Sequence, residues 1–269
     1  MSVPVLMILR MLCLMFLVTA LPAEREKTPP GVGVIDHRKQ KIPLSLEFKD
    51  EDGRTRKLGD FFKEGRPVVL APAYYNCPRL CTYVYNGLRD SVAANLRSGL
   101  NPGKDYQIVS FSFNPEEKTV IAGQKGSNYR KSVDTGTVHQ QDWPFLTGDA
   151  ANIEALNSAI GYQIKKDGPD FSHPSAIVIL TPDGTISRYM YGVDFPARTL
   201  RLSLVEASAG RIGSAADSVM LFCFRYDDQT GAYTPYAWAF VRITSVAILG
   251  TLLLLIFLLL RKDKTPRNP

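Results

Sequence analysis

The sequence predicts an α/β sandwich around one central sheet, and three observations support this prediction. Apolar strand patterns alternate with helical patterns along the chain, and the series ends in a hairpin followed by a helix. The chain has 269 residues, of which about 210 remain once two apolar terminal runs are set aside, the size of one α/β domain with extensions. Its 45% hydrophobic and 22% charged residues exclude a disordered or collagen-like protein, and four cysteines are too few for a disulfide-built scaffold.

The first half of the body contains two predicted strands and a helix. Apolar and polar residues alternate over 44–48, which predicts a short strand before a turn, and residues 58–63 suit one helical turn. Residues 66–75 form a continuous apolar run with β-branched residues, which is typical of a buried strand. Apolar residues then recur at helical spacing over 84–96, and Gly99 can end this helix.

The middle of the body repeats the strand–helix order. Residues 106–113 predict a second buried strand. Asn114 followed by Pro115 and two acidic residues predicts the start of a helix, with Asn114 as its cap. Residues 143–147 are short and apolar, and Asp149 is expected to cap a helix that runs through Ile160.

A hairpin and a helix complete the predicted body. Residues 176–180 and 186–190 are apolar strand patterns joined by a Thr-Pro-Asp-Gly sequence, and its proline and glycine suit a tight turn. Leucines within 200–205 belong to a last helix, which Gly210 can terminate. The body is therefore expected to occupy residues 43–210.

Both ends of the chain carry membrane signals. Arg10 precedes an apolar run over 11–21, so residues 1–23 are predicted to be a signal peptide, with an uncleaved N-terminal anchor as the alternative. Residues 243–260 carry no charge and would extend roughly 27 Å as a helix, close to the thickness of a bilayer core. Aromatic residues precede this run, and together they predict a transmembrane helix over 237–260.

Charge and composition give the expected topology and the remaining boundaries. Half of the formal charge of +6 lies in the tail 261–269, which has four basic residues and one acidic residue. By the positive-inside rule this tail is cytoplasmic. The C-terminal helix then anchors the protein in the cytoplasmic membrane, and the body is expected to face a periplasm or an equivalent compartment. Acidic and basic residues alternate elsewhere, which argues against nucleic acid as a partner.

Residues 24–42 are polar and rich in proline and glycine, which predicts a linker, and residues 211–236 form an extension.

Cys77 and Cys81 are the strongest chemical signal in the sequence. They lie where a predicted buried strand meets a helix, and residues four apart share a helix face, so the two sulfurs can converge. The partial positive charge of a helix N-terminus favours thiolates, so we expect a lowered pKa for these thiols. Paired thiolates can close to a disulfide or bind a soft ion such as Cu(I). A purely structural disulfide and two space-filling thiols are the alternatives.

A soft-metal site favours a third ligand, and imidazole suits copper. His37 in the linker and His139 in a glutamine-rich loop are expected to be exposed to solvent. His173 directly precedes the apolar strand at 176–180, and Pro174 restricts its backbone to extended geometry. Such a strand lies inside the sheet of a sandwich, so its start can face the cysteine loop. A structural hydrogen-bonding role for His173 is the alternative.

Several motifs, in order, resemble those of the Sco/SenC family. They are Tyr-Tyr-Asn-Cys-Pro-Arg-Leu-Cys at 74–81, Phe-Ser-Phe-Asn-Pro at 111–115, Trp-Pro-Phe-Leu-Thr-Gly at 143–148, and His173 nine residues before Pro182. The resemblance covers residues 40–210 and implies a thioredoxin-like fold with a central mixed sheet. It also implies a membrane-tethered protein that binds copper, as Cu(I) or Cu(II), through Cys77, Cys81 and His173. The implied partner is the copper-receiving subunit of cytochrome c oxidase or a related oxidase.

Three classes of function fit these residues. The first is a copper-binding assembly factor, or metallochaperone, that delivers copper to the dinuclear copper site of cytochrome c oxidase or prepares that site. The second is an extracytoplasmic thiol–disulfide oxidoreductase that uses the Cys77/Cys81 pair without an obligatory metal. The third is a non-catalytic membrane-bound interaction module. The first two need the same thiolates, so the sequence does not separate them.

Three features depart from the pattern of the family. Many members have aspartate at the position of Asn114, and the usual anchor is N-terminal, whereas the long apolar run here is C-terminal. Cys223 is an odd thiol in the mature chain. It is expected to be a small buried hydrophobic residue, and the alternatives are a fourth metal contact or an exchange partner for Cys77 or Cys81.

Overall fold

The computed structural model describes most of the body. The described residues are 30–209, without 64, 78–79, 135 and 169, and short stretches from residue 213 to residue 254. The predicted signal peptide 1–23, the tail 261–269 and Cys223 lie outside them, as does most of the predicted transmembrane helix 237–260. Within the described part of the chain, no helix combines the length and the apolar character needed to cross a membrane.

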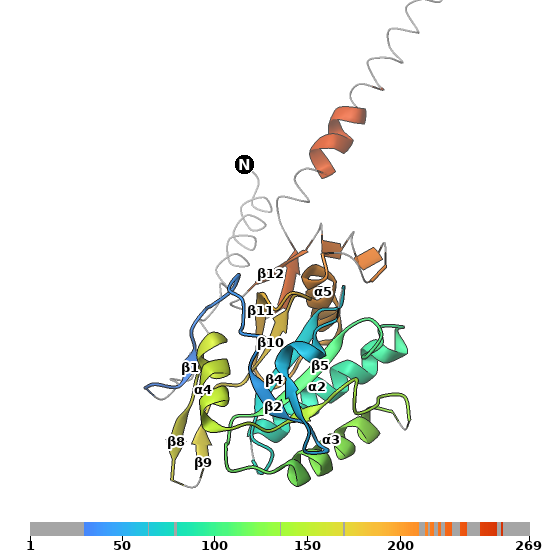
Figure 1. Ribbon diagram of the computed structural model, residues 1–269. Helices are drawn as coiled ribbons and strands as arrows, with labels where there is room; N and C mark the ends of the chain where they lie inside the picture. Colours follow the sequence, from blue (N-terminus) through green and yellow to red (C-terminus); the bar gives the residue numbers. More distant parts are fainter. Residues whose placement is uncertain are drawn as a thin grey trace, which may run out of the picture. The chain divides into compact units, whose positions relative to one another are not determined.

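A five-stranded mixed sheet forms the centre of the body, in the strand order β11-β10-β4-β5-β6 (Figure 1). Strands β4, β5 and β6 are parallel, whereas β10 is antiparallel to β4 and to β11. The strands are β4 (Val68–Ala73), β5 (Gln107–Ser112), β6 (Phe145–Leu146), β10 (Ala176–Leu180) and β11 (Ile186–Tyr191). This arrangement confirms the mixed central sheet.

Helices make the crossovers that parallel strands require. Helix α2 connects β4 to β5, and α3 connects β5 to β6. Helix α2 packs against both α3 and α5, so these three helices share one layer. The helices are α2 (Leu80–Arg97), α3 (Thr119–Val133), α4 (Ala150–Ala159) and α5 (Ala197–Ala207). Asp149 caps α4 and accepts a hydrogen bond from the backbone N–H of Asn152, as predicted.

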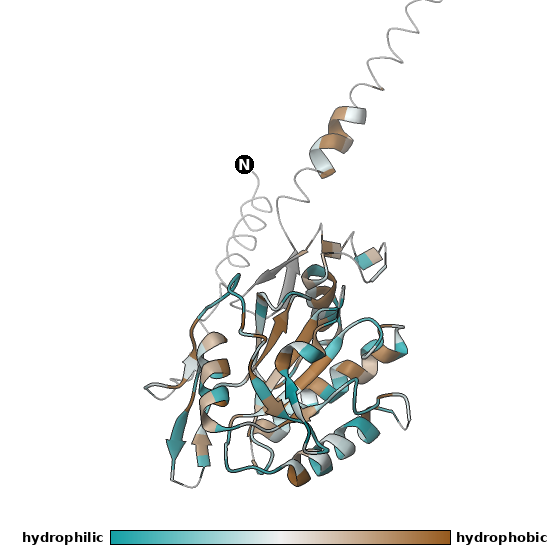
Figure 2. Ribbon diagram, in the orientation of Figure 1, coloured by the Kyte–Doolittle hydropathy of each residue, from teal (hydrophilic) through white to brown (hydrophobic). Residues whose placement is uncertain are grey.

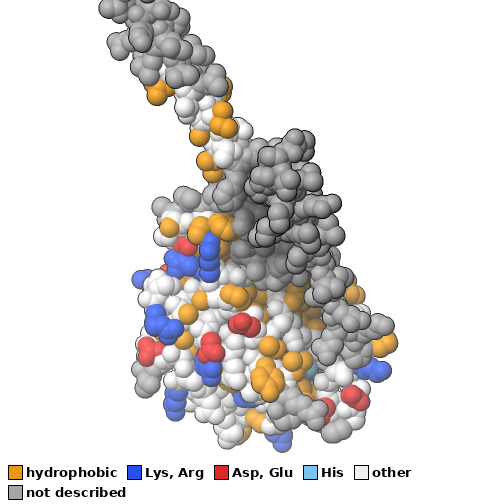
Figure 3. Space-filling model, turned by 180° about the vertical axis from the view of Figure 1, so that it is seen from behind, with side chains coloured by type: hydrophobic (Ala, Val, Ile, Leu, Met, Phe, Trp, Pro, Cys, Tyr) orange, Lys and Arg blue, Asp and Glu red, His pale blue; other side chains and the backbone are white. Residues whose placement is uncertain are grey.

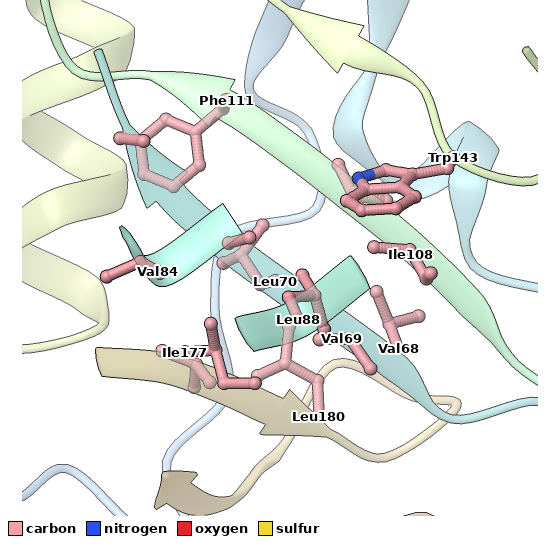
Figure 4. Close-up of a cluster of buried hydrophobic side chains, with 14 of the residues drawn as sticks. Val68, Val69, Leu70, Val84, Leu88, Ile108, Phe111, Trp143, Ile177 and Leu180 are labelled. Atoms are coloured by element: carbon pink, nitrogen blue, oxygen red, sulfur yellow. The ribbon is translucent and has the colours of Figure 1, made fainter. Parts of the chain in front are cut away.

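Burial on both faces explains why the central strands are largely apolar. Every residue of β4, β5 and β10 is buried, and these strands are brown in the hydropathy view (Figure 2). Figure 4 shows side chains from β4, β5 and β10 meeting the buried face of α2, where Val84 and Leu88 lie. The one polar group of Trp143 is satisfied there, since its indole N–H donates to Ser110 at 2.8 Å.

The helix predicted to start at Asn114 begins five residues later, at Thr119. Asn114 does accept a backbone hydrogen bond, from Glu116, but it caps a turn instead of a helix. The reason is the carboxylate of Glu117, which is buried and binds backbone N–H groups after β4. That contact ties Glu117 to the end of β4, and the helix begins only after it.

Small elements surround the sheet, and some of them were not predicted. Strand β1 (Gly33–Val34) lies within the predicted linker 24–42 and pairs with β7 (Tyr162–Gln163), so the folded part starts about ten residues earlier than residue 43. The other small elements are β2 (Glu47–Lys49), β3 (Thr55–Lys57), the 3₁₀ turn η1 (Leu58–Phe61), β8 (Lys165–Asp167), β9 (Asp170–Ser172), β12 (Phe224–Asp227) and β13 (Ala232–Pro235).

On the face drawn in Figure 3, basic and acidic side chains lie interspersed, as their alternation along the sequence indicates. One pair of charged side chains is buried instead of exposed. Arg130 and Glu51 form a salt bridge at 2.7 Å with side chains only 10% and 5% exposed. This pair joins helix α3 to the turn after β2, so we expect it to contribute to the stability of the fold.

An ion pair ties part of the predicted extension to helix α5, and it gives a pH prediction. Arg201 donates to both carboxylate oxygens of Asp217 at 2.8 Å, and Arg201 is the main reason why the pKa of Asp217 is lowered to about 2. A carboxyl whose pKa is lowered by folding stabilises the protein above its unfolded pKa, and this contribution is lost as the pH falls through the folded value.

We therefore expect the free energy of unfolding to fall by about 2 kcal/mol more in the wild type than in Asp217→Asn as the pH drops from 5 to below 2. Urea unfolding at a series of pH values measures this difference. Parallel pH profiles for the two proteins would show that the pair contributes nothing.

Candidate metal centre

The sheet topology brings Cys77, Cys81 and His173 to one edge. Strand β4 ends at Ala73 and leads into the cysteine loop. Strand β10 is its antiparallel neighbour, so the start of β10 lies beside the end of β4. His173 lies just before β10, and the two cysteines follow β4, although nearly a hundred residues separate them along the chain.

The three side chains predicted as ligands lie together. Their ligand atoms are all within 4.8 Å of one another, and all three residues are buried. The Sγ of Cys81 and the Nε2 of His173 are 3.1 Å apart, which is hydrogen-bonding distance for a thiol and an imidazole. Neither cysteine is in a disulfide bond, so each carries a thiol. The cluster is therefore a candidate metal centre with two sulfur donors and one nitrogen donor.

A backbone contact fixes which nitrogen of His173 can act as a ligand. The Nδ1 of His173 lies 2.9 Å from the carbonyl oxygen of Pro174. A carbonyl only accepts hydrogen bonds, so Nδ1 carries the proton and donates it, and the Nε2 lone pair faces Cys81. The hydrogen bond considered as an alternative role for His173 is thus present, but it occupies the other ring nitrogen and orients the ring.

The other two histidines do not join this cluster. His139 is exposed, as predicted. His37 was expected to be exposed and is half-buried instead. Its Nδ1 lies 3.1 Å from the carbonyl oxygen of Ala159, because the segment around β1 packs on the body.

The comparison with protein families decides the relationship. The SCO1/SenC family model matches residues 36–203, which is more than half of the chain. The chain belongs to the SCO1/SenC family. No curated protein matches the chain.

Solved structures of similar fold extend this finding. A candidate electron transfer protein from Aquifex aeolicus VF5 is 23% identical with a TM-score of 0.55, over 63% of this chain and 94% of its own. A candidate electron transport protein, also from Aquifex aeolicus VF5, is 20% identical with a TM-score of 0.51, over 63% of this chain and 98% of its own. BsSco, a member of the Sco family of cytochrome c oxidase assembly proteins, is 21% identical with a TM-score of 0.51, over 65% and 98%. At these identities the likeness concerns the fold, and the thioredoxin-like Sco fold is the one expected.

Burial changes the expected protonation of the cysteines in this SCO1/SenC protein. The prediction that both thiols have a lowered pKa is wrong for Cys81. Burial raises the pKa of the Cys81 thiol, and the neighbouring Cys77 adds to this effect. The sulfur of Cys81 is shielded from water, which disfavours an isolated thiolate more than the helix N-terminus favours it. Metal binding removes this penalty because the ion replaces the proton.

Aromatic rings surround His173 and limit the access of water. The ring of Phe113 lies 5.0 Å from that of His173, and the ring of Tyr74 lies edge-on at 6.2 Å. Phe171 packs against both Tyr74 and Phe113. The Tyr74 hydroxyl donates to Asp170 at 3.1 Å, and burial is the main reason why the pKa of Tyr74 is raised. The imidazole therefore lies in an apolar surrounding that holds it in one orientation.

Glu117 was not predicted as a functional residue, and the structure places it next to the cysteine loop. Its carboxylate accepts hydrogen bonds from the backbone N–H groups of Tyr75 and Asn76, both at 2.7 Å, and from the Ser112 hydroxyl at 2.6 Å. These contacts fix the backbone immediately before Cys77. The sequence signal was an acidic residue after β5, at the sheet edge where the parallel neighbour β4 also ends.

The donor set of this SCO1/SenC site suits copper. Two thiolates are soft ligands that favour Cu(I), and a neutral imidazole is a good ligand for either oxidation state of copper. The residues present can hold a metal ion without rearrangement of the sheet, since their ligand atoms already converge. Cys223, which was considered as a fourth contact, lies outside the described residues.

Proposed function

We propose that this chain is a membrane-tethered copper-binding assembly factor that delivers copper to the dinuclear copper site of cytochrome c oxidase or a related oxidase, or prepares that site. The observation that carries the proposal is the convergence of two cysteine sulfurs and one histidine nitrogen within 4.8 Å. Membership of the SCO1/SenC family supports it. The description of BsSco as one of the cytochrome c oxidase assembly proteins supports the partner.

The burial of the three ligands suits transfer of copper as cargo. Cys77 is 6% exposed and His173 is 7% exposed, whereas Cys81 is fully buried. The small exposed fractions of Cys77 and His173 are the route by which a partner's thiolate would reach a bound ion. On binding copper, each thiol would release its proton, and His173 would bind through Nε2 while Nδ1 keeps its proton and its hydrogen bond to the Pro174 carbonyl. A partner thiolate would then replace one of these two less buried ligands.

The proposed location follows from the two ends of the sequence. Residues 1–23 act as a signal peptide, and residues 237–260 span the cytoplasmic membrane, with the basic tail in the cytoplasm. The body then faces the periplasm or an equivalent compartment, where oxidising conditions allow disulfides to form. The receiving partner in this arrangement is a copper-binding oxidase subunit at the same membrane face.

A thiol–disulfide oxidoreductase is the second candidate, favoured by two neighbouring thiols that are not joined by a disulfide. The Cys77 thiolate, which is the more accessible one, attacks a client disulfide and releases one client sulfur as a thiolate. The Cys81 sulfur then attacks Cys77, releases the second client thiolate and closes a Cys77–Cys81 disulfide. Two electrons pass to the client, and a dithiol reductant must reopen the disulfide before the next cycle.

Copper titration of the reduced full-length protein tests the proposal. We expect one copper ion per chain to be retained against a competing Cu(I) chelator. The His173→Ala variant separates the two candidates, because it should weaken copper retention, partially for Cu(I) and more strongly for Cu(II), and leave reduction of a model disulfide almost unchanged. A reduced wild type that retains no copper but reduces disulfides would overturn the copper function and leave the oxidoreductase.

A further inference from the structure

The hairpin β8–β9 directly precedes His173 in the chain. Its second strand ends at Ser172, directly before the histidine. The two strands form a separate two-stranded sheet, and among the described residues no backbone hydrogen bond joins this hairpin to the central sheet. In Figure 1 the hairpin extends away from the central strands, below α4. On its C-terminal side His173 is held by Pro174, whose carbonyl accepts a hydrogen bond from the Tyr162 hydroxyl, and by the start of β10. On its N-terminal side its position depends on side-chain contacts between the hairpin and the body.

Tyr74 makes these contacts from the other side of the site. It follows β4 directly and lies three residues before Cys77, so its backbone belongs to the cysteine loop. Its ring lies 5.4 Å from that of Phe171, and its hydroxyl donates to Asp170, which is the first residue of β9. Tyr74 is only 5% exposed, so its ring is fixed by packing and its hydroxyl has a defined direction.

A second polar contact between the hairpin and the body, also within the described residues, is weaker. Lys166 and Glu116 form an ion pair at 3.5 Å, but their side chains are 62% and 77% exposed. Exposed ion pairs of this kind contribute little because solvent screens them and the side chains lose entropy. The hydrogen bond between Tyr74 and Asp170 is therefore the directional contact that joins the hairpin to the cysteine loop.

We propose that Tyr74 is a positioning residue for the third ligand: its hydroxyl holds hairpin β8–β9, and with it His173, against Cys77 and Cys81. This inference rests on the proposed copper function and adds to it the control of one ligand. Outer contacts that orient a metal ligand typically change metal affinity by about 10- to 100-fold when removed.

The two oxidation states of copper respond differently to the loss of this contact. Two thiolates are a sufficient donor set for Cu(I), whereas Cu(II) favours nitrogen ligation and depends more on the imidazole. Loosening of the hairpin should therefore weaken Cu(II) binding and leave Cu(I) binding nearly unchanged. A general loss of folding would weaken both.

The test is a set of substitutions in the full-length protein. Tyr74→Phe removes the hydroxyl and keeps the ring, and Asp170→Ala removes the acceptor. Each should lower Cu(II) affinity about tenfold or more and weaken the sulfur-to-Cu(II) charge-transfer absorption. The Tyr74 hydroxyl also hydrogen-bonds Cys77, so the double variant should lose no more than Tyr74→Phe alone. Asp170→Asn keeps an acceptor oxygen and should behave like the wild type. Tyr106→Phe is the matched control, because its buried hydroxyl has no hydrogen-bond partner among the described residues.

The outcomes separate this inference from the proposed function. A wild type that retains no copper would refute the copper function. A wild type that binds copper, with Cu(II) affinity unchanged by Tyr74→Phe, would refute the role of Tyr74 alone. If Asp170→Asn lost as much Cu(II) affinity as Asp170→Ala, the charge of Asp170 would act directly and the link would be wrong. In the metal-free protein, Tyr74→Phe should also speed amide hydrogen exchange over 165–172, and an unchanged rate would contradict the inference.

Discussion

Cys77→Ser and Cys81→Ser are each expected to abolish copper retention, with a loss of affinity greater than about 100-fold. Changes to groups that only orient a ligand cost about 10- to 100-fold, and loss of a thiolate ligand itself costs more. Serine is nearly isosteric with cysteine, but its hydroxyl does not ionise at neutral pH and is a hard donor that suits copper poorly. Copper content after gel filtration in the presence of a Cu(I) chelator measures the effect.

His173→Ala is expected to produce a partial loss, because two thiolates still hold Cu(I). The affinity for Cu(II) should fall more than the affinity for Cu(I), because Cu(II) depends more on the imidazole ligand. His139→Ala is the matched control, since that residue is exposed and lies outside the cluster. Copper retention that survives either cysteine substitution, or falls equally in His139→Ala, would contradict the assignment of the ligands.

Glu51→Ala is expected to destabilise the fold by about 3–5 kcal/mol, because it leaves a charged Arg130 buried without its partner. The two side chains form a bidentate pair, with both N···O distances 2.7 Å, and Glu51 also accepts the backbone N–H of Phe145. Burial raises the pKa of Glu51, which shows that the carboxylate depends on these donors to remain charged. Urea unfolding at neutral pH measures the loss.

The control for this pair is an exposed one. Asp36→Ala breaks the ion pair between Asp36 and Arg38, whose side chains are 51% and 40% exposed, respectively. This change should alter the free energy of unfolding by less than about 1 kcal/mol. The double variant Glu51→Leu/Arg130→Met removes both buried charges and should be much closer to the wild type than Glu51→Ala. A double variant as unstable as the single one would show that packing, and not the unpaired charge, causes the loss.

The sequence predicted the central sheet well because burial on both faces leaves a plain signal. Strand β10 was expected at its observed residues, and β4 and β5 were expected within runs a few residues longer than the strands. Such strands are continuous apolar runs when helices or loops cover both faces, and no tertiary knowledge is needed to recognise them. The cysteine pair could be found in the same way, since its spacing and its position after a buried strand are local features.

The parts that were missed depend on contacts distant in sequence. Hairpin β8–β9 has mostly exposed side chains, and β8 is drawn as hydrophilic in Figure 2, so it lacks the apolar pattern of a strand. Glu117 looks like an acidic residue in a first helical turn, and only its burial beside the cysteine loop changes that interpretation. The raised pKa of Cys81 likewise follows from burial, which local sequence does not show.

X-ray absorption at the copper edge tests the central claim most directly. The copper-loaded wild type should show two sulfur neighbours and one imidazole nitrogen around a single ion, and His173→Ala should lose the imidazole scattering while it keeps both sulfurs. Identical spectra for the two proteins, or a wild type whose copper has no sulfur neighbours, would contradict the claim that Cys77, Cys81 and His173 together hold the metal.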